Sequence, residues 1–140
     1  MEQGQIFGPV LSLMVLTGLV WLYMYSKRIP FIRSLDIDSS ELTPAFLASQ
    51  APRSVSNPSD NLKNLFEMPV LFYALSLYLY VTGQVDSTYT IAAWLYVVFR
   101  TLHSAVHCTV NIVLLRFVLY AISSLLFFFM LARAVLIYFF

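Results

Sequence analysis

The sequence predicts an all-α integral membrane protein, folded as a single domain of four transmembrane helices. Two observations predict this class. Of the 140 residues, 60% are hydrophobic and only 11% are charged, whereas a soluble domain is usually about half apolar and about a quarter charged. In addition, four apolar stretches reach roughly 20 residues, the length that a helix needs to cross a bilayer. These stretches use more than half of the chain, so we expect no separate soluble domain.

The first apolar stretch, from Ile6 to Tyr25, predicts a retained transmembrane helix rather than a cleaved signal peptide. A secretory signal begins with basic residues and has a shorter apolar core, whereas this chain begins without a basic residue. Lys27 and Arg28 follow the stretch directly, and such a flank is typical of a stop-transfer segment.

The next segment, residues 26–60, predicts a long polar loop. Within it, Thr43 and Pro44 precede a short run of helix-forming residues. Threonine is a good N-cap residue, and proline is favoured at the first helical position. We therefore expect a short helix here, lying on the membrane surface.

Three further transmembrane helices are predicted, over about residues 61–81, 88–108 and 110–138. A tight turn at Asp86 separates the first two of them. Within the second helix, Met68-Pro69 predicts a kink, because membrane helices tolerate proline.

The distribution of basic residues predicts the orientation in the membrane, since cytoplasmic loops carry an excess of Lys and Arg. The long loop is rich in them, whereas the N-terminus and the Asp86 turn have none. We therefore expect the long loop to be cytoplasmic and both termini to lie on the opposite side, where Arg133 reaches the interface. The basic residues of the loop are Lys27, Arg28, Arg33 and Arg53.

Charge and cysteine content exclude other classes of protein. The net charge is +1 and no Lys/Arg-rich run occurs, so no basic field for nucleic acid is expected. The chain has one cysteine, Cys108, which excludes an internal disulfide.

Polar side chains recur at one end of three predicted helices, and the spacing places those of the second and third helices, and Arg116 with Tyr120 on the fourth, each on one helix face. Lipid disfavours them, because an ionised side chain at mid-bilayer costs about 2.5–3.5 kcal/mol on insertion scales. We therefore expect a shared polar pocket inside the bundle, with positive charge that suits an anionic ligand. The residues are Asp60, Lys63, Asn64 and Glu67 on the second helix, Arg100, His103 and His107 on the third, and Asn111, Arg116 and Tyr120 on the fourth.

Three other interpretations of these residues stay open at this point. The first is a purely structural ion pair between Glu67 and Arg100. The second is a metal site at His103, His107 and Cys108, but two helical histidines without a dependable third ligand are a weak signal, so we expect no metal. The third is proton or ion transport through Glu67 and the histidines, which lacks the repeats and broken helix pairs of transporters.

The polar motifs resemble those of the MAPEG family, the membrane-associated proteins in eicosanoid and glutathione metabolism. The residues that carry the resemblance are Asn64-x-x-Glu67, Arg100-x-x-His103-x-x-x-His107 and Arg116-x-x-x-Tyr120. The resemblance covers nearly the whole chain and is nearest to the bacterial branch of the family. It implies a homotrimer of four-helix subunits in the lipid bilayer, with glutathione as co-substrate and a lipophilic small molecule as second substrate.

By this resemblance, Arg116 is implied to stabilise the glutathione thiolate, and Tyr120 to add a hydrogen bond. The thiolate is the nucleophile, and a free thiol titrates near ~8.5, so an adjacent guanidinium increases the thiolate fraction at neutral pH. The implied function is that of a membrane-bound, glutathione-dependent transferase or peroxidase acting on lipophilic electrophiles. The other residues implied to bind glutathione are Arg28, which acts from a neighbouring subunit, and Lys63, Asn64, Glu67, Arg100, His103 and His107.

The alternative function is that of a non-catalytic family member, which binds a lipid or another thiol and acts as a scaffold for partners. Asp60 and Lys63 stand where arginines are usual in the family's enzymes, and His107 stands where a tyrosine is usual. Lysine cannot bind a carboxylate with two parallel hydrogen bonds as arginine does, and Asp60 would repel a carboxylate. These departures favour the alternative.

Overall fold

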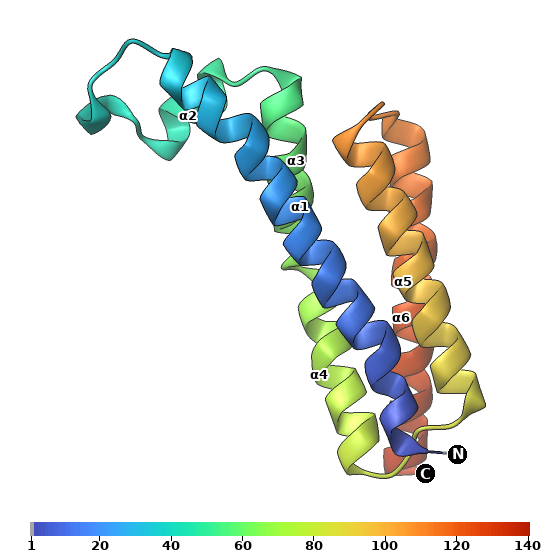
Figure 1. Cartoon of the computed structure of the whole chain (residues 1–140). Coiled ribbons are helices and arrows are strands. Elements are labelled where there is room, and N and C mark those ends of the chain that lie inside the picture. The colour runs from blue at the N-terminus through green and yellow to red at the C-terminus, as the bar shows by residue number, and fades with distance from the viewer. Residues whose placement is uncertain (1) are drawn as a thin grey trace.

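Figure 1 shows the computed structural model of the chain, which describes residues 2–140 apart from the side chain of Ser39. Within that range the fold is helical and contains no strand. The elements in chain order are η1 (Gln3–Ile6), α1 (Phe7–Ser34), η2 (Ser39–Glu41), α2 (Pro44–Gln50), α3 (Arg53–Leu65), α4 (Met68–Val81), α5 (Ser87–Cys108) and α6 (Val113–Phe139).

The long helices run between two ends of an elongated bundle (Figure 1). Helices α5 and α6 form one closely packed pair, and α1 packs mainly against α3 and α5. Both termini and the α4–α5 turn lie at one end, and α2 lies at the other together with the α5–α6 turn (Figure 1). We call this second end, which comprises residues 26–60 and 109–112, the α2 end.

Apolar and aromatic side chains from α1, α4, α5 and α6 form the core of the bundle. The rings of Phe72 and Tyr96 stack with their centroids 4.5 Å apart, and both side chains are fully buried. Outside this core, large apolar side chains are exposed along each long helix, among them Leu11, Leu77 and Leu125. Burying one such side chain is worth about 1.5–3 kcal/mol, so this surface fits lipid or neighbouring protein rather than water.

Three helical stretches are long and apolar enough to cross a membrane, namely Gln3–Ser34, Arg53–Val81 and Val113–Phe139. These stretches support a multi-pass integral membrane protein. Helix α5 is not among them, because its sequence carries the polar residues of the predicted third helix. Those polar side chains are buried against neighbouring helices, and α5 runs the length of the bundle beside α6 (Figure 1).

The segment 26–60 is more helical than the predicted loop. Helix α1 continues to Ser34, and α3 already begins at Arg53. The apolar pattern marks the part of a helix that lies in lipid, whereas backbone hydrogen bonds extend the helix into polar sequence. The short helix is confirmed, since the Thr43 hydroxyl accepts a hydrogen bond from the Phe46 amide at 3.2 Å and Pro44 occupies the first turn.

The predicted second transmembrane helix is divided into α3 and α4 at Phe66 and Glu67. Pro69 explains this break. Its nitrogen has no hydrogen to donate to the carbonyl of Leu65, and its ring would collide with that carbonyl in a continuous helix. Glu67 therefore occupies the N-cap position of α4, where its side chain makes no capping hydrogen bond and is exposed.

At the end that holds the termini, Asp86 joins α5 to α6. Its carboxylate accepts a hydrogen bond from the Tyr89 amide at 2.9 Å, which caps α5. The same carboxylate accepts two bonds from Arg133, at 2.9 and 2.6 Å. Arg133 also lies over the Tyr89 ring, with its guanidinium carbon 4.3 Å from the ring centroid. This bidentate hydrogen bonding holds the pKa of the Asp86 carboxyl below its usual value.

Replacing Arg133 with glutamine is expected to lower the free energy of unfolding by about 1 kcal/mol at neutral pH, the upper range for partly exposed ion pairs. A carboxyl with a depressed pKa stabilises the fold above its unfolded value of about 3.9 and loses that effect as the pH falls through the folded pKa. The difference in melting temperature between wild type and variant should therefore shrink below about pH 4. A difference that is independent of pH would contradict a role for the ionised Asp86.

Candidate functional site

Asn64 and His103 bring α3, α5 and α6 together near the α2 end. The Asn64 Nδ2 lies 3.4 Å from the His103 Nε2, and the His103 Nδ1 lies 2.9 Å from the backbone oxygen of Arg116. Because a carbonyl oxygen only accepts, we assign the imidazole proton to Nδ1, which leaves Nε2 to accept from the Asn64 amide. One buried imidazole therefore links three helices.

The side chain of Arg116 is held against the turn between α5 and α6. Its Nη1 donates to the Asn111 Oδ1 at 2.8 Å, and the Asn111 Nδ2 donates to the Asn57 Oδ1 at 3.1 Å. Asn111 has a φ of 46°, in the left-handed region that asparagine tolerates better than most residues. This chain of hydrogen bonds orients the guanidinium of Arg116, whose other N–H groups remain available to a ligand.

Arg100 is a fully buried cation without a counter-ion. Its guanidinium carbon lies 4.3 Å from the Tyr120 ring centroid and 5.4 Å from that of Tyr96. Among the described residues, none accepts a hydrogen bond from its three side-chain nitrogens. The desolvation penalty of a buried charge is several kcal/mol, and cation–π contacts return only about 2 kcal/mol of it. The position therefore favours an anion beside the guanidinium.

The structural ion pair between Glu67 and Arg100 is absent. The Glu67 side chain is exposed at the break between α3 and α4, and the ion pairs within residues 2–140 are Lys63–Asp60 and Arg133–Asp86. Because Pro69 ends the α3 helix before Glu67, the helical spacing from Asn64 does not bring Glu67 onto the same face. This sequence-based interpretation was therefore wrong.

His107 lies beside His103 in the same buried region. Their ring centroids are 5.6 Å apart in an edge-on arrangement, and the His103 ring is 5.5 Å from the Tyr120 ring. The His107 Nδ1 is buried and has no hydrogen-bond partner in the described part of the chain. No group of three His, Cys, Asp or Glu side chains that could hold a metal occurs between residues 2 and 140.

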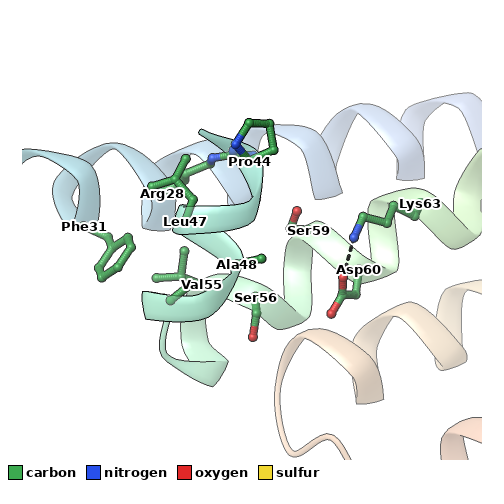
Figure 2. Close-up of a pocket in the computed structure, with 11 residues that line it drawn as sticks. Arg28, Phe31, Pro44, Leu47, Ala48, Val55, Ser56, Ser59, Asp60 and Lys63 are labelled. Atoms are coloured by element: carbon green, nitrogen blue, oxygen red, sulfur yellow. Dashed lines mark hydrogen bonds and ion pairs between the residues drawn. The ribbon is translucent and has the colours of Figure 1, made fainter. Parts of the chain in front are cut away.

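Arg28 and Lys63 lie apart from these residues, in a pocket of about 250 Å³ between α1, α2 and α3 (Figure 2). We call it the outer pocket. The Lys63 ammonium pairs with the Asp60 carboxylate at 2.9 Å, and both side chains are more than half exposed. Arg28 is half-buried and makes no ion pair with a described residue. The remaining lining is mostly apolar, with Ser56 and Ser59 as its hydroxyl groups.

The structure thus divides the predicted site into three parts. We call the first part the inner cluster. Its residues are Asn64, Arg100, His103, His107, Arg116 and Tyr120. Arg28 and Lys63 belong to the outer pocket, and Glu67 stands alone at the helix break.

Sequence reasoning missed the asparagines that support the inner cluster. The fully buried Asn61 accepts from the Ser104 hydroxyl at 3.3 Å, and Asn57 supports Asn111. Asn57, Asn61 and Asn64 follow the i, i+4, i+7 spacing of one helix face. That signal was present, but the second helix was predicted to begin at residue 61, which placed Asn57 in a loop.

The fold defines a helical membrane protein with a cluster of buried and half-buried polar and cationic side chains at one end. The sequence model of the MAPEG family matches residues 6–136, nearly the whole chain. The chain belongs to the MAPEG family. No curated protein and no solved structure matches it.

Proposed function

We propose that this protein is a membrane-bound, glutathione-dependent transferase or peroxidase that acts on lipophilic electrophiles. Membership of the MAPEG family supports a glutathione-related function of this kind. The observation that carries the proposal is the inner cluster, in which the unpaired guanidinium of Arg100 lies over the ring of Tyr120 and the guanidinium of Arg116 is held by Asn111 with its other N–H groups free. One buried and one half-buried cation, neither paired with a carboxylate, suit an anionic thiol.

In this proposal Arg116 stabilises the thiolate of glutathione. A guanidinium beside the sulfur lowers the pKa of the thiol, because it interacts more favourably with the charged form. The Tyr120 hydroxyl donates a hydrogen bond to the same sulfur. The thiolate then attacks the electrophilic atom of the second substrate, and the bond from that atom to its leaving group breaks as the leaving group takes the electron pair. The second substrate arrives from the apolar side of the bundle.

Arg100, His103, His107 and Asn64 line the ligand in this proposal. His103 has both ring nitrogens engaged by Asn64 and the backbone of Arg116, so it holds the helices in register. Glu67, exposed at the break, and Arg28 and Lys63 in the outer pocket take part across a subunit boundary of a homotrimer. The exposed apolar surface of the long helices supports such an assembly in lipid.

The proposed topology has four spans, with α5 as the third of them. Its polar residues are buried within the bundle, which removes the main obstacle to crossing lipid. The proposed orientation places the α2 end in the cytoplasm, since Lys27, Arg28 and Arg33 lie there and basic loops are retained on that side.

The first test is glutathione binding to the purified protein in detergent, with the bound thiolate followed by its ultraviolet absorbance. Wild type is expected to give the thiolate signal at millimolar glutathione. Arg116→Ala should lose it, because a hydrogen bond to a charged group is worth about 1.5–3 kcal/mol, which corresponds to roughly 10- to 150-fold in the acid dissociation constant of the bound thiol.

Arg33→Ala serves as the matched control, since Arg33 is an exposed cation at the end of α1. It should leave the thiolate signal unchanged. Absence of glutathione binding to wild type would rule out the transferase proposal.

The second candidate function is a non-catalytic family member that binds a lipid or another thiol. The ion pair between Lys63 and Asp60 favours it, because this pair occupies the lysine that would otherwise bind a carboxylate of glutathione. Recovery of a bound lipid from a wild-type protein that shows no thiolate signal would support this candidate.

A further inference from the structure

A second polar pocket, of about 510 Å³, lies at the α2 end between α1, the start of α3 and the turn from α5 to α6. We call it the turn pocket. Its size falls within the usual range of small-molecule sites, about 300–1,000 Å³. The residues that line it are Tyr23, Lys27, Arg53, Ser54, Asn57, Cys108, Thr109, Val110 and Asn111.

The turn pocket carries two positive charges and no carboxylate. Lys27 and Arg53 supply the charges, and neither forms an ion pair with any described residue. The Lys27 ammonium lies over the Tyr23 ring, 5.4 Å from its centroid. At an exposed site this contact is worth only about 0.5–1 kcal/mol, so both cations remain available to an anion.

The outer pocket differs from the turn pocket in this respect. It also has two cationic residues, but its Lys63 is paired with Asp60. A carboxylate ligand there would meet one free cation and one fixed negative charge. In the turn pocket it would meet two free cations together with the Ser54 hydroxyl and the amides of the asparagines.

The turn pocket adjoins the inner cluster through Asn111. This residue lines the pocket and also accepts the hydrogen bond from Arg116. A ligand that fills the pocket therefore lies one amide side chain away from the guanidinium that is proposed to hold the thiolate. Glutathione is a short peptide with two carboxylates and one thiol. The closeness of the turn pocket to Arg116 suits such a ligand, because its carboxylates and its thiolate are charged groups at different points of one molecule.

We propose that the turn pocket is the subsite for the carboxylate groups of the thiol co-substrate, with Lys27 and Arg53 as the binding cations. This inference rests on the proposed function. Arg53 supplies two parallel hydrogen bonds to a carboxylate, and Lys27 supplies a point charge. These cations replace the arginines that the family's enzymes usually carry where this chain has Asp60 and Lys63.

The test uses S-methylglutathione as well as glutathione, because the methylated peptide keeps both carboxylates and has no ionisable thiol. Binding of each to the full-length protein in detergent is measured by titration calorimetry. A double variant, Lys27→Gln with Arg53→Gln, should weaken both ligands on the order of 10- to 100-fold, as expected for lost charge-assisted bonds. The exchange Lys27→Arg with Arg53→Lys should retain most of the affinity.

Arg33→Gln is the matched control, since it removes a cation at the same end of the molecule but outside both pockets. If the double variant binds S-methylglutathione as well as this control does, the subsite is wrong, while a thiolate signal in wild type would leave the proposed function intact. If S-methylglutathione binding depends on the two cations and no thiolate forms, the subsite stands and thiolate activation fails. If wild type binds neither peptide, both proposals are overturned.

Discussion

Replacing Arg100 with methionine is expected to raise the thermal stability of the protein while it removes glutathione binding. The Arg100 side chain is fully buried, and its nitrogens find no acceptor among the described residues. Replacing a buried ion pair with apolar side chains of similar volume is often stabilising by about 1–4 kcal/mol, and a buried cation without a counter-ion lacks even the attraction that offsets part of the desolvation penalty of a pair. Methionine is flexible enough to fill the space between the Tyr96 and Tyr120 rings. The measurement is the melting temperature in detergent, beside a glutathione titration of the same sample.

Arg100→Lys provides the control for this prediction. It keeps a buried positive charge, so it should show no gain in stability and should retain some affinity for the anionic ligand. A methionine variant that melts below wild type would contradict the prediction. It would indicate that the guanidinium has an anionic partner in the assembled protein even without ligand.

Two replacements of Asn111 are expected to separate its backbone role from its side-chain role. Asn111→Gly keeps a residue that adopts a positive φ without strain and removes only the amide that joins Arg116 to Asn57. Asn111→Ala removes the same amide and adds a left-handed alanine, which costs about 1–2 kcal/mol more. The glycine variant should therefore be the more stable of the two.

Both Asn111 variants should raise the pKa of the bound glutathione thiol by a similar amount, because both release the Arg116 side chain. A pH titration of the thiolate absorbance measures this value directly. A thiol that titrates as in wild type while the protein is destabilised would show that Asn111 acts only on the fold. Asn57→Ala, which removes the more distant amide, should produce a smaller shift in the same direction.

The helices could be predicted from the sequence because the apolar stretches are as long as membrane spans and because characteristic residues mark where helices begin. Asp86 marked the start of α5, and Thr43 with Pro44 marked α2. The polar spacing also predicted that Arg100, His103 and His107 share one face of a helix, and in the structure all three are buried on α5. Three spans are supported by length and composition, whereas α5 does not meet that criterion because its sequence carries the polar residues of the inner cluster.

The remaining parts of the site depend on where the helices begin and break. Glu67 does not lie on the polar face that the sequence predicts, because the helix ends before Pro69 where the sequence predicts only a kink. Arg28 and Asn57 lie on helices and not in the predicted loop, because α1 and α3 extend into sequence that has no apolar pattern. Backbone hydrogen bonding decides where these helices begin and end, and the spacing of apolar residues in the sequence gives no information about it.

The break at Glu67 also bears on depth in the bilayer. A helix rises about 1.5 Å per residue, so the 14 residues of α4 span about 21 Å of a hydrocarbon layer that is roughly 30 Å thick. In the proposed topology the first turns of α3 therefore stand above the acyl chains, and Asn64 lies close to the boundary of the hydrocarbon layer. A water-borne peptide and a lipid-borne molecule can both reach that depth without leaving the phase in which each dissolves.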